Sequence, residues 1–209
     1  MIRLFNAFVK ITGFPVAAAI FRTKIFYENK AVSCRRIRGA AIIVSNHTSV
    51  FDYAVLLFVF FGRTLRTLMA EVLFQKQPLG TFLKMMGGIR VDRGSADYGF
   101  MSKCEKILSS GGVVCVFPEG RIPLKGEARP LPFGPGAAYL SAASGVPVIP
   151  VYTDGGYFGK KRAHVIIGTP VYPPVTDGSD PSAVSAYNDA IREKIKFLGE
   201  LLEKRKKEK

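Results

Sequence analysis

Residues 40–52 read AAIIVSNHTSVFD, an apolar run that passes into a polar loop. A short apolar run bounded by polar residues is typical of a buried strand, so we predict a strand over residues 40–45. Thr48 or Ser49 is a suitable N-cap for a helix, which we predict over residues 50–61. A buried strand that leads through a short loop into a helix indicates an α/β fold.

The rest of the chain repeats this alternation of strand and helix. We predict a helix that opens at Pro78 and a long last helix that opens at Pro181, because proline suits the first turn of a helix. The terminal KRKKEK is expected to be a frayed, solvated end. Further strands are predicted over residues 66–70, 88–92, 113–117, 147–152 and 164–168, and further helices over 96–109 and 136–144. The sequence therefore predicts one α/β domain, residues 31–209, with a mostly parallel central sheet flanked by helices.

Residues 1–30 differ from this pattern, because phenylalanines are set among basic residues there. We predict two short apolar helices, broken near residues 13–15. The apolar run 11–21 is shorter than the ~20 residues needed to cross a bilayer. Aromatic and basic side chains together suit a segment that lies in the headgroup layer of a membrane. We therefore expect an interfacial two-helix element; helices that cap a soluble core are the alternative.

The charge of the chain is strongly basic, with 30 Lys and Arg against 16 Asp and Glu. Residues 1–38 carry eight basic residues against one acidic residue, and residues 192–209 carry eight against four. Basic ends on an apolar chain favour an anionic partner, either phospholipid headgroups or nucleic acid, although a soluble basic surface is also consistent with them. Because no nucleic-acid motif is recognisable, we expect an anionic phospholipid membrane and no nucleic acid.

Cysteine and histidine usage limits the chemistry further. The three cysteines share no short spacing, which indicates free thiols in a reducing compartment. Only two histidines are present, so a metal site built from His and Cys is poorly supported.

Polar residues follow three of the predicted strands at the point where each strand ends. His47 and Asp52 follow the first, Arg93 follows the strand 88–92, and Glu119 and Arg121 follow the strand 113–117. If these strands are parallel, their carboxyl ends meet at one edge of the sheet, where open α/β sheets bind ligands. We therefore expect these five side chains to converge.

Within this set, the pair His47 and Asp52 gives the most specific indication of catalytic chemistry. A carboxylate bonded to imidazole fixes its tautomer and stabilises the imidazolium that forms when the ring takes a proton. Ser49 and the cysteines are candidate nucleophiles, but none lies in a G-x-S-x-G elbow. The simpler interpretation is a general base that activates the hydroxyl of the acceptor itself. The two arginines match phosphate, and Glu119 can orient an arginine or bind a substrate hydroxyl. A tight turn at Gly120 would present backbone N–H groups to an anion.

Four segments, in order, resemble the sequence blocks of the glycerolipid acyltransferase family, and within it the bacterial 1-acylglycerol-3-phosphate acyltransferases. Each block alone is weakly specific, but four in order with family-like spacing make a strong signal over residues 40–152. The blocks are NH-x4-D at residues 46–52, GIRVDR at 88–93, FPEGR at 117–121 and the apolar proline strand VPVIPV at 146–151.

The resemblance implies a role for each matching position. His47 would deprotonate the acceptor hydroxyl and Asp52 would orient it. Arg93, Glu119 and Arg121, with Asn46 and Gly120, would bind the glycerol phosphate, and the fourth block would line the acyl-chain side. Arg121 follows Glu119 by two positions, where the commoner form of the motif has three. The resemblance implies no metal and no bound cofactor, because the acyl thioester is a co-substrate.

The leading hypothesis is transfer of a fatty acyl group from acyl-CoA or acyl-carrier protein to lysophosphatidate, giving phosphatidate for phospholipid synthesis. The acceptor could instead be glycerol-3-phosphate or another lysolipid. A hydrolase that uses Ser49 or Cys115, and a non-catalytic basic module that binds membrane or nucleic acid, are alternatives of other classes. We expect a monotopic or peripheral protein at the cytoplasmic face of the cell membrane.

Overall fold

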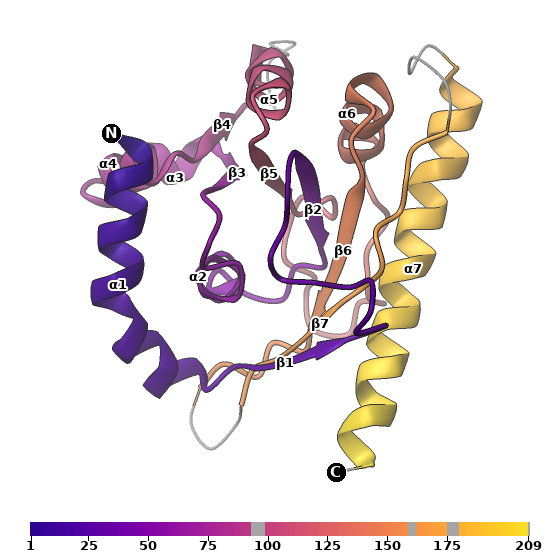
Figure 1. Ribbon diagram of the computed structural model, residues 1–209, viewed down its shortest axis with the longest axis horizontal. Coiled ribbons are helices and arrows are strands. Elements are labelled where there is room, and N and C mark those ends of the chain that lie inside the picture. Colours follow the sequence, from indigo (N-terminus) through magenta and orange to yellow (C-terminus); the bar gives the residue numbers. More distant parts are fainter. Residues whose placement is uncertain (93–98, 159–161, 175–179, 209) are drawn as a thin grey trace.

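A computed structural model describes residues 1–92, 99–158, 162–174 and 180–208. These residues form a seven-stranded sheet in the order β1-β7-β6-β2-β5-β3-β4. Neighbouring strands run parallel except β6 and β7, which are antiparallel. The strands are β1 (Lys24–Tyr27), β2 (Ala41–Ser45), β3 (Leu65–Ala70), β4 (Ile89–Val91), β5 (Val113–Val116), β6 (Val148–Thr153) and β7 (His164–Ile167). The predicted α/β fold with a mostly parallel sheet is confirmed (Figure 1).

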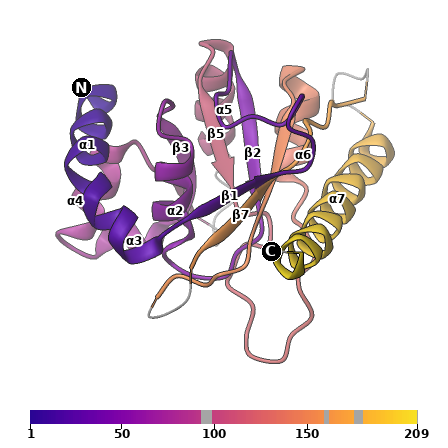
Figure 2. The same cartoon turned by 60° about the horizontal axis from the view of Figure 1, so that its bottom comes forward.

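Helices cover both faces of the sheet, which is why the central strands are continuous apolar runs. They are α1 (Ile2–Phe21), α2 (Asp52–Val59), α3 (Glu71–Gln75), α4 (Leu79–Met86), α5 (Gly99–Ser109), α6 (Gly136–Ser144) and α7 (Pro181–Lys207). Ile43 of β2 packs with α1 and α2, whereas Ile42 and Val44 pack with α5, α6 and α7. Figure 2 shows α1 and α7 on opposite sides of the molecule with the sheet between them.

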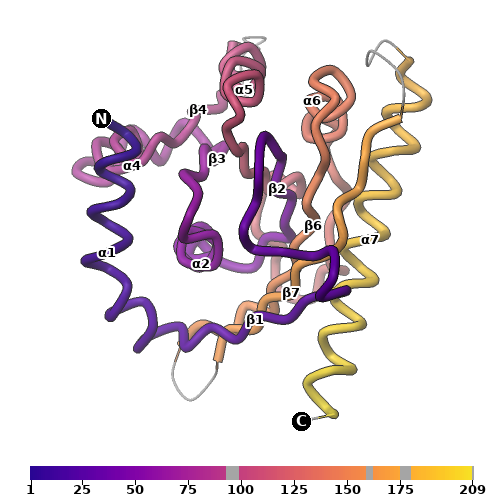
Figure 3. Tube along the Cα trace, in the orientation of Figure 1, coloured from indigo at the N-terminus to yellow at the C-terminus, as the bar shows by residue number. Residues whose placement is uncertain are grey.

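The N-terminal segment differs from its prediction. One continuous helix, α1, takes the place of the two short helices and contains Pro15 in its interior. Because Pro15 has no N–H to donate one turn back, a bend is expected there, and Figures 1 and 3 show α1 bending before it passes into β1. Residues 24–27, predicted as helix, form β1 because Ile25 and Phe26 pair in parallel with Val165 and Ile166 of β7.

Helix α1 is also longer than the apolar run that suggested it. By length and composition α1 could cross a membrane. Only 22% of its most apolar 18-residue stretch is buried in the protein. The run 11–21 was too short a measure of this segment, because the helix begins at Ile2 and includes Arg3, Asn6 and Lys10. The predicted domain boundary at residue 30 stays a prediction.

The last helix differs from its prediction at its end. It begins at Pro181 as expected, with Asp180 accepting hydrogen bonds from the backbone of Ser182 and Ala183. It runs unfrayed to Lys207. Arg205 donates to the carbonyl oxygens of Tyr27 and Glu28, and Lys206 lies 3.1 Å from the carboxylate of Asp154. These contacts hold the last turn against the sheet.

Candidate active site

The candidate site lies at the carboxyl ends of β2 and β5, which pair in parallel with Val44 opposite Val116. His47 follows β2 by two residues and Glu119 follows β5 by three. The backbone N–H of His47 donates to Glu119 Oε1 at 2.8 Å, so the two loops are joined directly. The predicted convergence is confirmed for this pair. Arg93 lies outside the described residues.

Asp52 is the most heavily bonded side chain of the site. His47 Nδ1 lies 2.7 Å from Asp52 Oδ2, which also accepts the backbone N–H groups of Thr48 at 2.6 Å and Ser49 at 2.9 Å. Asp52 Oδ1 accepts the hydroxyl groups of Thr48, at 2.7 Å, and Tyr157. The carboxylate is fully buried, and burial alone would raise its pKa. The hydrogen bonds from His47, Tyr157, Ser49 and Thr48 outweigh burial, and the pKa of Asp52 is lowered.

These bonds also correct the predicted cap of α2. Thr48 and Ser49 do not cap the helix with their side chains; the helix begins at Asp52, after Phe51. The loop folds back on the helix instead, so that its N–H groups point at the Asp52 carboxylate. The carboxylate is thereby held in one orientation before any ligand arrives.

The His47 ring has one bonded nitrogen and one available nitrogen. With Nδ1–H donated to Asp52, the lone pair is on Nε2, which makes no hydrogen bond within the described residues. The side chain is 20% exposed. Its ring stacks on Phe117, with centroids 4.5 Å apart and planes 23° from parallel. A ring fixed on one side by a carboxylate and on one face by phenylalanine can accept a proton at Nε2 from a bound hydroxyl group.

Glu119 supports this site from the β5 loop. Its Oε1 accepts the N–H of His47, its Oε2 accepts the N–H of Leu131 at 2.9 Å, and the side chain is buried. Both carboxylate oxygens of Glu119 are therefore used to hold backbone N–H groups of neighbouring loops. Gly120 has a φ of +71°, which favours glycine, and its N–H donates to the carbonyl of Phe117 at 3.0 Å. The predicted tight turn is therefore present, and the Gly120 N–H is used within it; that the turn binds an anion stays a prediction.

Arg121 lies further out, on the surface. Its guanidinium makes two hydrogen bonds to the carboxylate of Glu127, at 2.6 and 2.7 Å. These bonds raise the pKa of Arg121, and Arg121 together with the N–H of Leu124 lowers the pKa of Glu127 to about 2. In this structure Arg121 is bonded to Glu127. Its predicted contact with a substrate phosphate therefore stays a prediction.

Asn46 joins two strands beneath the site. Its amide donates to the Thr153 carbonyl at 2.9 Å and accepts the Thr153 N–H at 2.8 Å, and it is buried. These bonds continue the pairing of β2 with β6 by one step past Ser45 and Val151. Both polar ends of the amide are occupied, so the structure gives Asn46 a positioning role.

Tyr157 is the site residue that sequence reasoning missed. It is buried behind the site, where its hydroxyl contacts Asp52 Oδ1 and lies 2.8 Å from Thr153 Oγ1. Burial, followed by the charge of Asp52, raises its pKa, so it remains a neutral donor. The available signal was the polar segment 154–157 directly after the strand β6, which is the arrangement that singled out the other loops.

The segment after β6 also contains a second His–Asp pair. His164 Nδ1 lies 2.8 Å from Asp154 Oδ2, and the same oxygen accepts a hydrogen bond from Lys206. Asp154 thereby joins β7 to the end of α7. Among the described residues, no three His, Cys, Asp or Glu side chains form a group that could hold a metal ion.

An apolar cavity of about 170 Å³ lies beside the FPEGR segment. It is bounded by β3, β4, β5, α5 and α6, and its lining includes Leu68, Val91, Phe100, Met101 and Leu140. Phe117, whose ring stacks on His47, also lines it. No residue of the fourth block, 146–151, lines this cavity. An apolar space next to the loop of Phe117 is a suitable place for part of an apolar ligand.

Comparisons with known proteins agree with this geometry. The family model described as "Acyltransferase" matches residues 24–154. Three proteins named 1-acyl-sn-glycerol-3-phosphate acyltransferase are similar in sequence. The chloroplastic BAT2 of Brassica napus is 28% identical over 143 residues, 63% of this chain and 40% of that protein. The beta form of Homo sapiens is 28% identical over 142 residues, which are 65% of this chain and 50% of that protein. The protein of Bacillus subtilis (strain 168) is 26% identical over 132 residues, which are 60% of this chain and 64% of that protein.

A solved structure has the same fold. It is the 1-acyl-sn-glycerophosphate (LPA) acyltransferase PlsC from Thermotoga maritima, with a TM-score of 0.68 and 20% sequence identity over 94% of this chain and 79% of that chain. At this identity the similarity shows the fold alone. The alignments span 40 to 64% of the length of the three sequence relatives.

Proposed function

The chain belongs to the acyltransferase family, and on that premise we propose that it transfers a fatty acyl group from acyl-CoA or acyl-carrier protein to the free hydroxyl group of lysophosphatidate, giving phosphatidate. The observation that carries the proposal is the His47 ring, which is fixed by the buried Asp52, keeps Nε2 available, and stacks on Phe117, a residue that lines an apolar cavity. The names of the three relatives support lysophosphatidate as the acceptor.

The proposed reaction needs one base and no enzyme-bound acyl group. His47 Nε2 takes the proton of the acceptor hydroxyl as its oxygen attacks the thioester carbonyl carbon. The tetrahedral intermediate collapses to the ester, the carbon–sulfur bond breaks, and the imidazolium returns the proton to the leaving thiolate. Asp52 stays ionised throughout and stabilises the imidazolium. A positioned base of this kind contributes roughly 10²- to 10⁴-fold in rate.

The substrates have different places in this proposal. The part of the donor's acyl chain nearest the thioester lies in the apolar cavity of about 170 Å³ beside Phe117, and the thioester faces His47 Nε2. Arg121 reaches the phosphate of the acceptor by exchanging Glu127 for it, since a guanidinium binds phosphate and carboxylate with the same geometry. Arg93, which follows β4 in sequence, is the second candidate for this phosphate. The thioester donor supplies the acyl group, so no resident cofactor takes part.

Membrane attachment belongs to the same proposal. The helix α1 exposes Leu4, Phe8, Ile11 and Val16, and an exposed apolar helix face suits the interface of a bilayer. We place the protein as a monotopic enzyme at the cytoplasmic face, where an acyl-CoA or acyl-carrier protein is available. Free thiols at the three cysteines are consistent with that compartment.

The hydrolase alternative finds little support in the candidate nucleophiles. Cys115 is fully buried within β5, and burial raises its pKa to about 12. Ser49 accepts a hydrogen bond from the N–H of Phe51, and its backbone N–H supports Asp52. A buried thiol at this pKa is a poor nucleophile near neutral pH.

The experiment that tests the function is a substrate panel with the detergent-purified protein. Lysophosphatidate, glycerol-3-phosphate and a lysophosphatidylcholine are each incubated with palmitoyl-CoA or palmitoyl-acyl-carrier protein, and acylated products are identified by mass spectrometry. We expect phosphatidate from lysophosphatidate with at least one donor. If only glycerol-3-phosphate were acylated, it would replace lysophosphatidate as the proposed acceptor. Release of free fatty acid without an acylated product would favour the hydrolase.

A further inference from the structure

A second cavity lies at the opposite edge of the sheet from His47. It is open to solvent, has a volume of about 970 Å³ and is bordered by the first half of α1, the turn after α2 and the residues that precede β3 and β5. Thr64 comes directly before β3, and Gly111 and Gly112 come directly before β5, so this is the amino edge of those strands. Nothing in the proposed acyl transfer uses this cavity.

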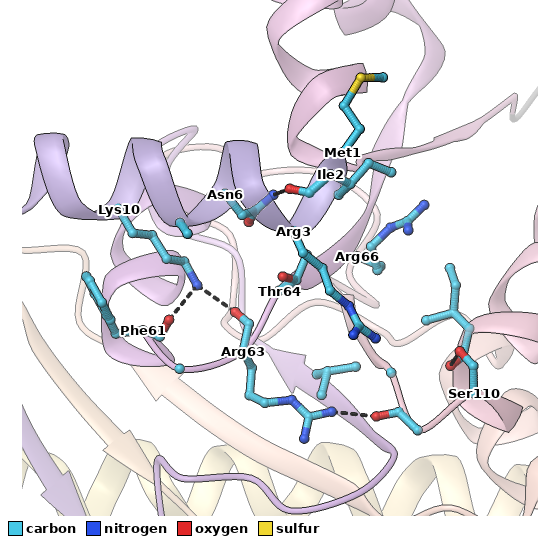
Figure 4. A pocket seen from close by; sticks show the side chains of 16 residues that line it. Met1, Ile2, Arg3, Asn6, Lys10, Phe61, Arg63, Thr64, Arg66 and Ser110 are labelled. Carbon is cyan, nitrogen blue, oxygen red and sulfur yellow. Dashed lines mark hydrogen bonds between the residues drawn. The ribbon is translucent and has the colours of Figure 1, made fainter.

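The cavity is strongly basic. Arg3, Lys10, Arg63 and Arg66 line it, and no Asp or Glu is among the described residues around it (Figure 4). Four cations around one cavity without a carboxylate repel one another, unless an anion lies between them. The composition of the lining therefore points to an anionic ligand.

Two of these cations are already bonded to the protein. Lys10 Nζ donates to the carbonyl oxygens of Phe60, Phe61 and Arg63, at 3.3, 3.0 and 2.5 Å. The guanidinium of Arg63 donates to the carbonyls of Ile37, Gly39 and Gly111, at 3.0, 2.8 and 2.6 Å. These groups give the cavity its charge and its shape.

The other two cations keep donors for a ligand. Arg3 reaches from α1 into the cavity and makes no hydrogen bond or ion pair with the part of the chain that the structure describes. Arg66 donates only Nε, to the carbonyl of Gly87 at 2.7 Å, and its two terminal nitrogens have no acceptor among those same residues. Two guanidinium groups with free N–H groups match the oxygens of a phosphate.

The position of the cavity along α1 indicates where such a phosphate comes from. Arg3, Asn6 and Lys10 share one face of α1, at helical spacing. Leu4, Phe8 and Ile11 form the adjacent exposed face. A neighbouring groove of about 580 Å³ continues along α1 past Phe61 and is lined by Arg35, Arg36 and Phe14, and the described part of its lining contains no acidic residue. Basic cavities beside an apolar helix face fit the depth of the headgroup layer.

We propose that the cavity binds the phosphate of an anionic glycerophospholipid of the bilayer, with Arg3 and Arg66 as the donors to the phosphate oxygens. The lipid acts here as a ligand and not as the acyl acceptor, because the cavity and His47 lie at opposite edges of the sheet. Binding fixes the orientation of α1, and with it the whole domain, on an anionic membrane.

Lys10 gives a second readout of occupancy. Burial lowers its pKa to about 8. An anion in the cavity stabilises the ammonium form and raises this pKa, whereas a lipid bound elsewhere leaves it unchanged.

The test is a calorimetric titration of the full chain, held in zwitterionic detergent, with dihexanoyl phosphatidylglycerol below its critical micelle concentration. The matched variants are Arg3→Gln and Arg66→Gln, with Lys204→Gln as the control that loses one exposed cation on α7. We expect saturable binding to the wild type and to Lys204→Gln, at least tenfold weaker binding to Arg3→Gln and to Arg66→Gln, and a higher pKa of Lys10, measured by NMR, when the lipid is bound.

Two further probes separate the sources of phosphate. Dihexanoyl phosphatidylcholine and inorganic phosphate are each expected to bind at least tenfold more weakly than phosphatidylglycerol. Equal binding of inorganic phosphate would overturn the assignment to a lipid. Equal losses in Arg3→Gln and Lys204→Gln, or binding that leaves the pKa of Lys10 unchanged, would overturn the site. No acyl donor is present, so these outcomes do not depend on whether the protein transfers acyl groups.

Discussion

The hydroxyl group of Tyr157 donates a hydrogen bond to Asp52 Oδ1, while His47 Nδ1 faces the other carboxyl oxygen, Oδ2. Tyr157 and Asp52 are 105 positions apart in sequence. Tyr157 thus fixes the carboxylate from behind, on the side remote from the imidazole. It is a positioning residue, because it acts on His47 only through Asp52.

We expect Tyr157→Phe to lower kcat roughly tenfold, the equivalent of about 1.4 kcal/mol, with little change in KM. The substitution removes one donor to Asp52 but leaves the contacts of Thr48 in place. Tyr152→Phe is the matched control, because it removes a half-buried hydroxyl group from the same strand region without touching Asp52. Equal kinetics for wild type and Tyr157→Phe would remove Tyr157 from the mechanism.

The stability of the protein should depend on the ionisation of Asp52. Its pKa is lower in the folded state than in the unfolded chain, so its contribution is complete above the unfolded value of about 3.9 and is lost as the pH falls through the lower, folded value. In Asp52→Asn that contribution is absent, and the free energy of unfolding should fall less steeply between about pH 4 and pH 2. Urea denaturation followed by circular dichroism measures this slope. Asp189→Asn, which removes an exposed carboxylate, should keep the slope of the wild type.

Replacement of Glu119 should loosen the loop that holds His47. Glu119→Gln keeps one oxygen acceptor and sets an NH₂ group against the N–H of either His47 or Leu131. Burying an unpaired donor costs about 1 to 3 kcal/mol, so we expect kcat/KM to fall roughly 10- to 100-fold. Glu127→Gln is the counterpart at a half-buried surface carboxylate and should retain kcat. If both variants behaved alike, the buried bonds of Glu119 would have no special part in holding His47.

Much of the sheet could be predicted from the sequence, because its strands are buried on both faces and so read as unbroken apolar runs. Residues 41–45 and 113–116 are examples, and every residue of both strands is buried. The site followed from the same pattern, since polar residues after parallel strands meet at one edge. His47 and Glu119 met there as expected.

Contacts between distant segments could not be predicted in this way. Residues 24–27 continue the apolar N-terminal run that was predicted as helix. Ile25, Phe26 and Tyr27 also suit a strand, and pairing with β7 decides between the two. A local rule suggested that Pro15 ends a helix, but packing of Ala17 and Phe21 against the core lets α1 continue through it. The polar segment 154–157 marks a loop after β6, but the contact of Tyr157 with Asp52 exists only in three dimensions.

The end of α7 illustrates this limit and is open to test. Arg205→Met removes the hydrogen bonds to the carbonyls of Tyr27 and Glu28, and we expect it to destabilise the protein by about 1 to 3 kcal/mol. Hydrogen exchange of the amides 203–207 should become faster at the same time. Lys207→Met changes an exposed neighbour and should leave both quantities near those of the wild type. Fast exchange of these amides already in the wild type would mean that the last turn is frayed after all.

The central claim is that His47 is the general base of an acyl transfer, and the chain offers a matched control for it. His164 also faces a carboxylate, Asp154, at 2.8 Å, but outside the proposed mechanism. Free thiol release from palmitoyl-CoA in the presence of lysophosphatidate is followed for wild type, His47→Ala and His164→Ala, with folding checked by circular dichroism. We predict that His47→Ala loses roughly 10²- to 10⁴-fold in rate while His164→Ala stays close to the wild type. Thiol release by His47→Ala at the wild-type rate, with phosphatidate formed, would contradict the account.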